Sequence, residues 1–357
     1  MSDQPRLFVI NPGSTTTKIA LYEGEHVREI HELEHDRAEL AKFPTTLSQL
    51  EYRRDALHKA LAFWNVPVSS LSAVISRGCP LKPLQSGVYA IDEAMLSDIR
   101  SGRLQDHASH LGPLLAHEIA EEAKIPAFIA DPVSVDEFDE VARISGWPDL
   151  PRGTLSHALN IKAMLREAAE ERGVEPETLN AVVAHLGGGF SIAAVRKGRI
   201  VDVNNANDGG PFSPERVGTL PLVGLLKLCY SGKYTYDQLR KMLIGKGGLM
   251  AHLGTADVRE VLKRIDAGDQ KARLVLEAMC YQISKEIGAM AAVLCGKVDM
   301  IILTGGIAYN PFVVEYVRER AGFIAPLVIK PGQNELKALA AHALRALMHP
   351  EVIQNYA

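Results

Sequence analysis

The feature that most constrains this chain is a strand–turn–strand pattern that occurs twice. An apolar strand predicted over residues 6–11 is followed by a turn of small polar residues and a return strand over 15–22. A second apolar strand over 180–186 is followed by three glycines and two further strands over 190–203. The spacing is far longer than a solenoid repeat of about 20–50 residues. The pattern therefore predicts two similar domains that each open on a hairpin, the second starting near Thr154. Two unrelated hairpins are the alternative.

The rest of the chain alternates predicted helices with short strands. Helical spacing of apolar residues extends over 38–63, 108–123, 156–172, 311–320 and 336–348, and short apolar strands are expected at 72–76, 127–130, 298–303 and 327–329. Alternation of this kind is typical of a mainly parallel sheet. The predicted fold class is therefore α/β.

Composition excludes several classes of function. The 357 residues carry a net charge of -4, whereas proteins that coat DNA or RNA have an excess of positive charge. The four cysteines are scattered, which argues against a zinc ribbon or a disulfide framework and fits a reducing cytoplasm. The polar N-terminus lacks a signal-peptide pattern, and no apolar run approaches the ~20 residues of a membrane helix. We expect a cytoplasmic protein that binds neither nucleic acid nor membrane.

The first turn, at 11–17, carries more polar groups than a hairpin needs. Gly13 permits backbone conformations that other residues avoid, and the free N–H groups of such a turn can form an anion-binding concavity. Ser14 and Thr16 add hydroxyl donors, and Lys18 adds a positive charge. A plain hairpin needs only a two-residue turn. The pattern therefore favours phosphate binding over a simple polar tip.

Two further turns are rich in glycine. Gly187, Gly188 and Gly189 precede a return strand, but the last position of a dinucleotide-binding fingerprint is not glycine, which argues against a Rossmann site. No P-loop pattern occurs. Gly305 and Gly306 follow a predicted strand, where they would let the backbone approach an adenosine closely. We expect these turns to contact a nucleotide.

Two arginines lie where they suit recognition of an anion. Arg77 ends a predicted strand, and Arg216 lies in a loop bounded by proline and glycine. A guanidinium binds planar carboxylate or phosphoryl oxygens through two parallel hydrogen bonds. A solvated surface position is the alternative for both.

Histidines and carboxylates add further candidates. His157 at a helix start and His185 at a strand end are placed for contacts with a phosphoryl group, and an ordinary core histidine is the alternative for each. Asp131 ends a strand, where α/β proteins present catalytic side chains, and is a candidate to hold Mg²⁺ through a water; a turn-forming aspartate before proline is its alternative. Glu335 begins the last helix, where a carboxylate also stabilises the helix dipole.

Three segments together resemble one family. They read Asn-Pro-Gly-Ser-Thr-Thr-Thr-Lys at 11–18, His-Leu-Gly-Gly-Gly-Phe-Ser at 185–191 and Leu-Thr-Gly-Gly-Ile at 303–307. With them, the chain resembles the acetate and butyrate kinases over nearly its whole length, within the larger group of actin-like sugar and carboxylate kinases. The loops at 208–216 and 218–221 look like those of the butyrate kinases.

The resemblance implies a fold of two ribonuclease-H-like (actin-like ATPase) domains with the active cleft between them. It also implies that the last helix packs back on the first domain. The expected domains are therefore 1–153 together with about 336–357, and 154–335 with the nucleotide site.

The resemblance also implies roles for the candidate residues. It places Asn11, Ser14 and Lys18 near the transferring phosphoryl group, and it assigns Arg77 and Arg216 to the carboxylate and the γ-phosphate. It places Asp131 and Glu335 near Mg²⁺, and His157, His185 and either His107 or His110 along the phosphoryl path. Gly187 and Gly188 would approach the phosphates, and Gly305 and Gly306 the nucleotide. Two positions depart from the family pattern. Val217 puts the placing of Arg216 in question, and Cys79 is a candidate reactive thiol.

The implied reaction is ATP + carboxylate ⇌ ADP + acyl phosphate, with butyrate or a branched relative as the expected substrate and ATP/ADP and Mg²⁺ as cofactors. A homo-oligomer is also expected from the family. Acetate or propionate kinase, a sugar or glycerol kinase, and a non-catalytic nucleotide sensor on the same fold remain alternatives, because a fold does not determine a function.

Overall fold

The computed structural model describes residues 4–104 and 107–356. The chain divides into two compact units: unit 1 contains residues 1–135 and 334–357, and unit 2 contains residues 136–333. The first boundary therefore precedes residue 136, whereas the sequence-based prediction placed it before residue 154.

Residues 136–153 belong to unit 2 because their charged side chains bind its sheet. Asp139 accepts a hydrogen bond of 2.6 Å from Arg196, and Arg152 pairs with Asp202 at 2.7 Å. No local pattern reveals such partners, since they lie about fifty residues further along the chain.

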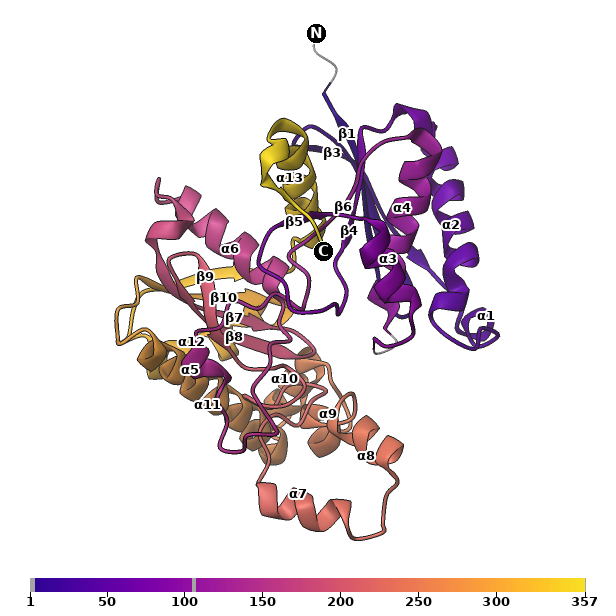
Figure 1. The fold of residues 1–357 in the computed structure, drawn as a ribbon. Helices are drawn as coiled ribbons and strands as arrows, with labels where there is room; N and C mark the ends of the chain where they lie inside the picture. The colour runs from indigo at the N-terminus through magenta and orange to yellow at the C-terminus, as the bar shows by residue number, and fades with distance from the viewer. Residues whose placement is uncertain (1–3, 105–106, 357) are drawn as a thin grey trace. The chain divides into compact units, whose positions relative to one another are not determined.

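Unit 1 is a seven-stranded sheet with helices on both faces. Its elements are β1 (Arg6–Pro12), β2 (Thr16–Glu23), β3 (His26–Glu34), α1 (Arg37–Leu40), α2 (Leu50–Phe63), β4 (Ala73–Arg77), β5 (Val88–Ala90), α3 (Glu93–Arg100), α4 (Leu111–Ala123), β6 (Ala127–Ala130), α13 (Glu335–Met348) and β12 (Ile353–Gln354). The strand order is β12-β5-β6-β4-β1-β2-β3. In Figure 1, α13 covers one face of this sheet, and α2 and α4 cover the other.

Two parts of unit 1 differ from the sequence-based prediction. The edge strand β3 was not predicted, because nearly every side chain in it is exposed and no alternation of apolar and polar residues marks it. The predicted helix over 38–63 is interrupted, and its long part begins only at Leu50.

Unit 2 is a five-stranded sheet with a similar layering. Its elements are α5 (Glu140–Arg143), α6 (Ala158–Glu170), β7 (Asn180–Leu186), β8 (Phe190–Arg196), β9 (Arg199–Val203), α7 (Leu222–Cys229), α8 (Tyr236–Leu243), α9 (Gly248–Leu253), α10 (Val258–Asp266), α11 (Gln270–Val293), β10 (Met300–Gly305), α12 (Pro311–Ala321) and β11 (Leu327–Pro331). The strand order is β11-β10-β7-β8-β9. Helix α6 lies on one face and α11 on the other (Figure 1).

The two sheets share one topology. The order β3-β2-β1-β4-β6 in unit 1 corresponds to β9-β8-β7-β10-β11 in unit 2, with two antiparallel pairings followed by two parallel ones. The predicted α/β class is confirmed. No helix within residues 4–104 and 107–356 is both long and apolar enough to span a bilayer.

Candidate functional site

In unit 1, the candidate residues gather where β1, β4 and β6 end. Asn11 lies near the end of β1, and its side-chain amide donates a 2.6 Å hydrogen bond to Glu335 Oε2 at the start of α13. Arg77 ends β4, with its guanidinium 3.6 Å from the same oxygen. The neutral amide of Asn11 and the positive charge of Arg77 thus meet at one carboxylate oxygen, and Arg77 keeps part of its surface exposed.

The hairpin turn lies beside this cluster. Lys18 is directly opposite Asn11 in the β1–β2 ladder, so the two side chains lie on the same face of the sheet. Lys18 is about half exposed and lies 4.0 Å from Glu32 on β3, while Ser14 is exposed. Thr16 begins β2, and its carbonyl accepts a hydrogen bond from Gly13 N that closes the turn.

Asp131 follows β6, and its side chain is buried within unit 1. Its Oδ1 accepts hydrogen bonds from the Ser86 hydroxyl at 2.6 Å and the Gly87 N–H at 2.8 Å. Its Oδ2 bonds His342 Nε2 on α13 at 3.0 Å, and the side chain has no exposed surface. Because both oxygens are engaged, this carboxylate holds a loop and a helix in place and presents no open oxygen to a ligand.

Other residues of unit 1 take structural positions. His107 precedes a short 3-10 helix, Ala108–His110, and its ring accepts a hydrogen bond from the Ser109 N–H. His110 lies within hydrogen-bond distance of the Pro80 carbonyl and is almost fully buried. Cys79 was a candidate reactive thiol, and the structure argues against that role: the side chain is fully buried, and burial raises its pKa far above the usual range.

In unit 2, the two candidate histidines stack. His157 precedes α6, His185 lies in β7, and their ring centroids are 4.0 Å apart with the planes inclined by 14°. The Nδ1 of His157 lies 2.8 Å from the Ser191 hydroxyl on β8. Helix α6 and the β7–β8 hairpin thus hold both rings in one orientation.

Two residues that sequence reasoning missed hold His185. Its Nδ1 lies 2.7 Å from Asn160 Oδ1, and its Nε2 lies 3.1 Å from the side-chain nitrogen of Gln333. Asn160 Oδ1 is an acceptor, so Nδ1 of His185 carries the proton and Nε2 accepts from Gln333. Asn160 was identifiable only as a residue one helical turn after His157, and Gln333 only as a neighbour of Glu335.

The glycine turn after β7 is packed against Arg216. A Cβ atom added to Gly189 would collide with the Arg216 guanidinium, so the absence of a side chain lets the arginine lie against the turn. The Ser213 hydroxyl connects the two segments, since it donates to the Gly188 carbonyl at 2.6 Å and accepts from Arg216 N at 3.2 Å. Burial lowers the pKa of Arg216, while the nearby Glu215 raises it.

The third glycine turn has one packed and one open member. Gly305 has φ +86°, and a Cβ there would collide with the backbone of Leu186, so the close approach of the end of β10 to the end of its neighbour β7 requires glycine. Gly306 is exposed, with no atom within 4 Å of an added Cβ. The open position fits the approach of a ligand better than the packed one.

Comparison with solved structures identifies the fold. The chain is similar to the structure of an acetate kinase from Porphyromonas gingivalis, with a TM-score of 0.79, 19% identity and coverage of 96% of this chain and 100% of that one. A propionate kinase from Francisella tularensis subsp. tularensis gives a TM-score of 0.74 at 17% identity over 95% of this chain and 98% of that one. The predicted actin-like ATPase fold is therefore confirmed.

Sequence comparison identifies the family. The sequence model of the Acetokinase family matches residues 156–336. "Butyrate kinase 1" of Clostridium acetobutylicum is 48% identical over 98% of this chain and 99% of its own. "Probable butyrate kinase 2" of Caldanaerobacter subterraneus subsp. tengcongensis is 51% identical over the same shares. The chain belongs to the acetokinase family.

Proposed function

We propose that this chain is a butyrate kinase, which phosphorylates butyrate or a branched four- or five-carbon acid with ATP in a reversible reaction. The similarity to the butyrate kinase of Clostridium acetobutylicum over nearly the full length of both chains carries this proposal. The charged residues expected from the family are all present, which disfavours a non-catalytic sensor.

The chemistry asks for positive charge rather than for a base. A carboxylate is already a nucleophile, so the difficulty is to bring two anions together and to stabilise charge on the transferring phosphoryl group. We assign this task to the guanidinium groups of Arg77 and Arg216 and to His157. Fixed donors in a site that excludes water stabilise such charge strongly, and positioning alone can supply about 7–11 kcal/mol.

The nucleotide assignment rests on the turns of both units. The phosphates are assigned to the hairpin turn with Asn11, Ser14, Thr16 and Lys18, to His185 and to the turn formed by Gly187, Gly188 and Gly189. The adenosine is assigned to Gly305 and Gly306, with Gly306 as the closer contact because its surface is open.

The donor groups in unit 1 fit Mg²⁺ at Glu335 but not at Asp131. Glu335 Oε1 accepts no hydrogen bond from the described residues, whereas both oxygens of Asp131 are engaged. Across residues 4–104 and 107–356, no three His, Cys, Asp or Glu side chains come together as a metal site. Mg²⁺ usually keeps several waters and takes one or two carboxylates with substrate phosphates, so one carboxylate suffices. Bound there, the ion would neutralise phosphate charge, and Asp131 would position His342 and the loop at Ser86.

The proposal also includes a location in the cell and an oligomeric state. The free cysteines support a cytoplasmic location. A homo-oligomer is supported by α7, whose apolar side chains Leu222, Val223 and Leu226 are all exposed.

The experiment that tests the function is ADP release from Mg-ATP with carboxylates from acetate to isovalerate, with glycerol and a blank without acceptor. The proposal requires activity that peaks on four- or five-carbon acids. Activity on acetate alone would indicate an acetate kinase, and activity on glycerol a sugar-type kinase. ATP binding without acceptor-dependent release would leave only a nucleotide sensor.

A further inference from the structure

Unit 1 contains a fully buried arginine that has no carboxylate partner. Arg53 lies in α2, and none of its surface is exposed. Among the described residues, no Asp or Glu lies within ion-pair distance of its guanidinium. A buried charge without a counter-ion is costly unless every hydrogen-bonding group is satisfied. The structure must therefore offer the five N–H groups of Arg53 a complete set of acceptors.

These acceptors come mainly from the hairpin turn between β1 and β2. Nη1 donates to the Gly13 carbonyl at 2.8 Å and to Thr17 Oγ1 at 3.2 Å, and Nη2 donates to the Ser14 carbonyl at 2.8 Å. Nε and Nη2 donate to Gln49 Oε1 at 3.1 and 2.9 Å. All five N–H groups are thus used on neutral oxygens, and the positive charge is not cancelled.

The geometry of the peptide unit determines what this does to the turn. In a trans peptide, the C=O and the following N–H point in opposite directions, and no cis peptide occurs among the described residues. Since the carbonyls of Gly13 and Ser14 point at Arg53, the N–H groups of Ser14 and Thr15 point away from it. Neither N–H donates to a described group, and both residues have exposed surface. The turn therefore presents two free donors, with a buried cation behind them.

A neighbouring histidine does not neutralise or add to this charge. Thr17 Oγ1, which accepts from Arg53, lies 2.8 Å from His35 Nε2, and its hydrogen can be donated to that nitrogen. An accepting Nε2 belongs to a neutral imidazole. Burial first, and the charge of Arg53 second, lower the pKa of His35 to about 4, in agreement with that arrangement. The ring of Tyr52 packs edge-on against His35, with the ring centroids 5.5 Å apart.

We infer that Arg53 is a positioning residue that pre-forms the 13–17 turn as a receptor for a phosphoryl group. It holds the carbonyl oxygens on the side away from the ligand, directs the Ser14 and Thr15 N–H groups outward, and supplies a positive charge behind them. The inference rests on the proposed function, which brings a phosphoryl group to this turn. Arg53 itself touches no substrate.

The test compares three variants of the full chain. Arg53→Met removes the charge and the hydrogen bonds. Arg53→Lys keeps the charge but loses the planar guanidinium with its five N–H donors, and Arg54→Gln is the matched control. Arg54 is one-third exposed and pairs with the carboxylates of Glu51, Asp55 and Glu118, not with the hairpin turn. Two measurements are made besides activity: the amide NMR shifts of Ser14 and Thr15 on addition of Mg-ATP or inorganic phosphate, and the pKa of His35.

In the wild type and Arg54→Gln, we expect both amide resonances to shift with Mg-ATP. In Arg53→Met the shifts should be lost and kcat/KM for ATP should fall about tenfold or more, with Arg53→Lys between them. The pKa of His35 should rise in Arg53→Met and stay near the wild-type value in Arg54→Gln, provided that circular dichroism shows a folded chain.

Three results would overturn the inference. The first is that the wild-type Ser14 and Thr15 amide resonances do not shift at saturating Mg-ATP. The others are a folded Arg53→Met with wild-type kcat/KM for ATP, or a loss of kcat/KM in Arg54→Gln as large as that in Arg53→Met. If Arg53→Met fails to fold, the wild-type amide shifts and the Arg53→Lys kinetics decide. Amide shifts in a wild type that releases no ADP with any carboxylate would count against the proposed function alone.

Discussion

At the scale of single residues, the arrangement around Arg216 depends on a missing side chain. Gly189 leaves room for the guanidinium, and Ser213 connects its loop to the glycine turn. Val217 departs from the family pattern, which put the position of Arg216 in question. In the structure, the Val217 N–H donates a 3.2 Å hydrogen bond to the Leu243 carbonyl. The loop therefore has a defined backbone at Arg216.

Arg216→Ala should lower kcat far more than it raises the KM for ATP. The reason is that a fixed cation acts mainly on charge that develops in the transition state, and losing such a donor costs about 10²–10³ in kcat. Steady-state kinetics with butyrate measure both constants, with the exposed Arg240→Gln as control. A variant with wild-type kcat and only a raised KM would remove Arg216 from the transition state.

His35 should make the stability of unit 1 depend on pH. Its pKa is lowered from 6.5 to about 4, so the neutral buried ring contributes stability above pH 6.5, and this is lost as the pH falls toward 4. Relative to His35→Gln, the wild type should lose about 2 kcal/mol of unfolding free energy between pH 6.5 and 5.

The measurement is urea unfolding of both proteins in a Trp147→Phe background, where Trp64 reports on unit 1. The control is His31→Gln, because His31 is exposed on β3. Equal pH dependence of the wild type and His35→Gln would contradict a neutral buried His35.

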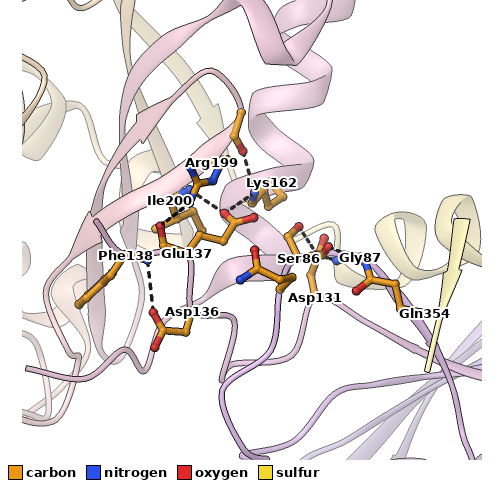
Figure 2. A network of polar contacts seen from close by, with 12 residues as sticks. Ser86, Gly87, Asp131, Asp136, Glu137, Phe138, Lys162, Arg199, Ile200 and Gln354 are labelled. Atoms are coloured by element: carbon orange, nitrogen blue, oxygen red, sulfur yellow. Dashed lines mark hydrogen bonds and ion pairs between the residues drawn. The ribbon is translucent and has the colours of Figure 1, made fainter. Parts of the chain in front are cut away.

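At the scale of elements, α6 is anchored by a buried ion pair. Lys162 Nζ lies 2.7 Å from Glu137 Oε2 and 2.6 Å from the Gly198 carbonyl, and the same glutamate oxygen accepts from Ile200 N at 2.7 Å (Figure 2). Both charged side chains are almost fully buried. The pair ties α6, which His157 precedes, to the β8–β9 turn.

Lys162→Met should destabilise unit 2 by about 3–5 kcal/mol, because it leaves Glu137 buried without a partner. The double variant Glu137→Leu/Lys162→Met should recover much of this loss, since neither charge then remains. Urea unfolding in a Trp64→Phe background, where Trp147 reports on unit 2, measures the change, with exposed Lys263→Met as control. A double variant no more stable than the single one would show that packing, and not the unpaired charge, causes the loss.

At the scale of the whole molecule, α7 is an apolar helix whose side chains are not buried. Its eight residues include five Leu or Val side chains, none of its residues is buried, and Leu222 and Leu226 are 80% and 58% exposed. A helix that is apolar on all sides is normally buried. A second copy of the chain is the occupant expected from the family.

We therefore expect the wild type to elute as a multimer and Leu226→Glu to shift toward one chain. Size-exclusion chromatography with light scattering at micromolar concentration gives the mass. Phe323→Glu, which also changes an exposed apolar residue of unit 2 but lies outside α7, should leave the mass unchanged. A wild type with the mass of one chain would contradict the assembly.

Much of the fold was predictable because its signals are local. Apolar runs ended by glycine, serine or asparagine identify β1, β2, β7, β8 and β9 within two residues of their observed bounds. The exposed β3 and the helices α7–α11 were not predicted, although α8 and α10 have the amphipathic spacing of surface helices. Helix α11 spans 24 residues and packs on the sheet of unit 2.

The sequence by itself determined the α/β class, the repeated hairpin and the residues that mark the acetokinase family, because these depend on residue type and short spacing. Only the tertiary structure decided which groups are available. Glu335 keeps an open oxygen while Asp131 does not, Gln333 holds His185, and Arg53 supports the first turn. The physical reason is that hydrogen-bond partners are set by packing: Asn11 and Glu335 meet across 324 residues, a separation on which no periodicity or motif reports.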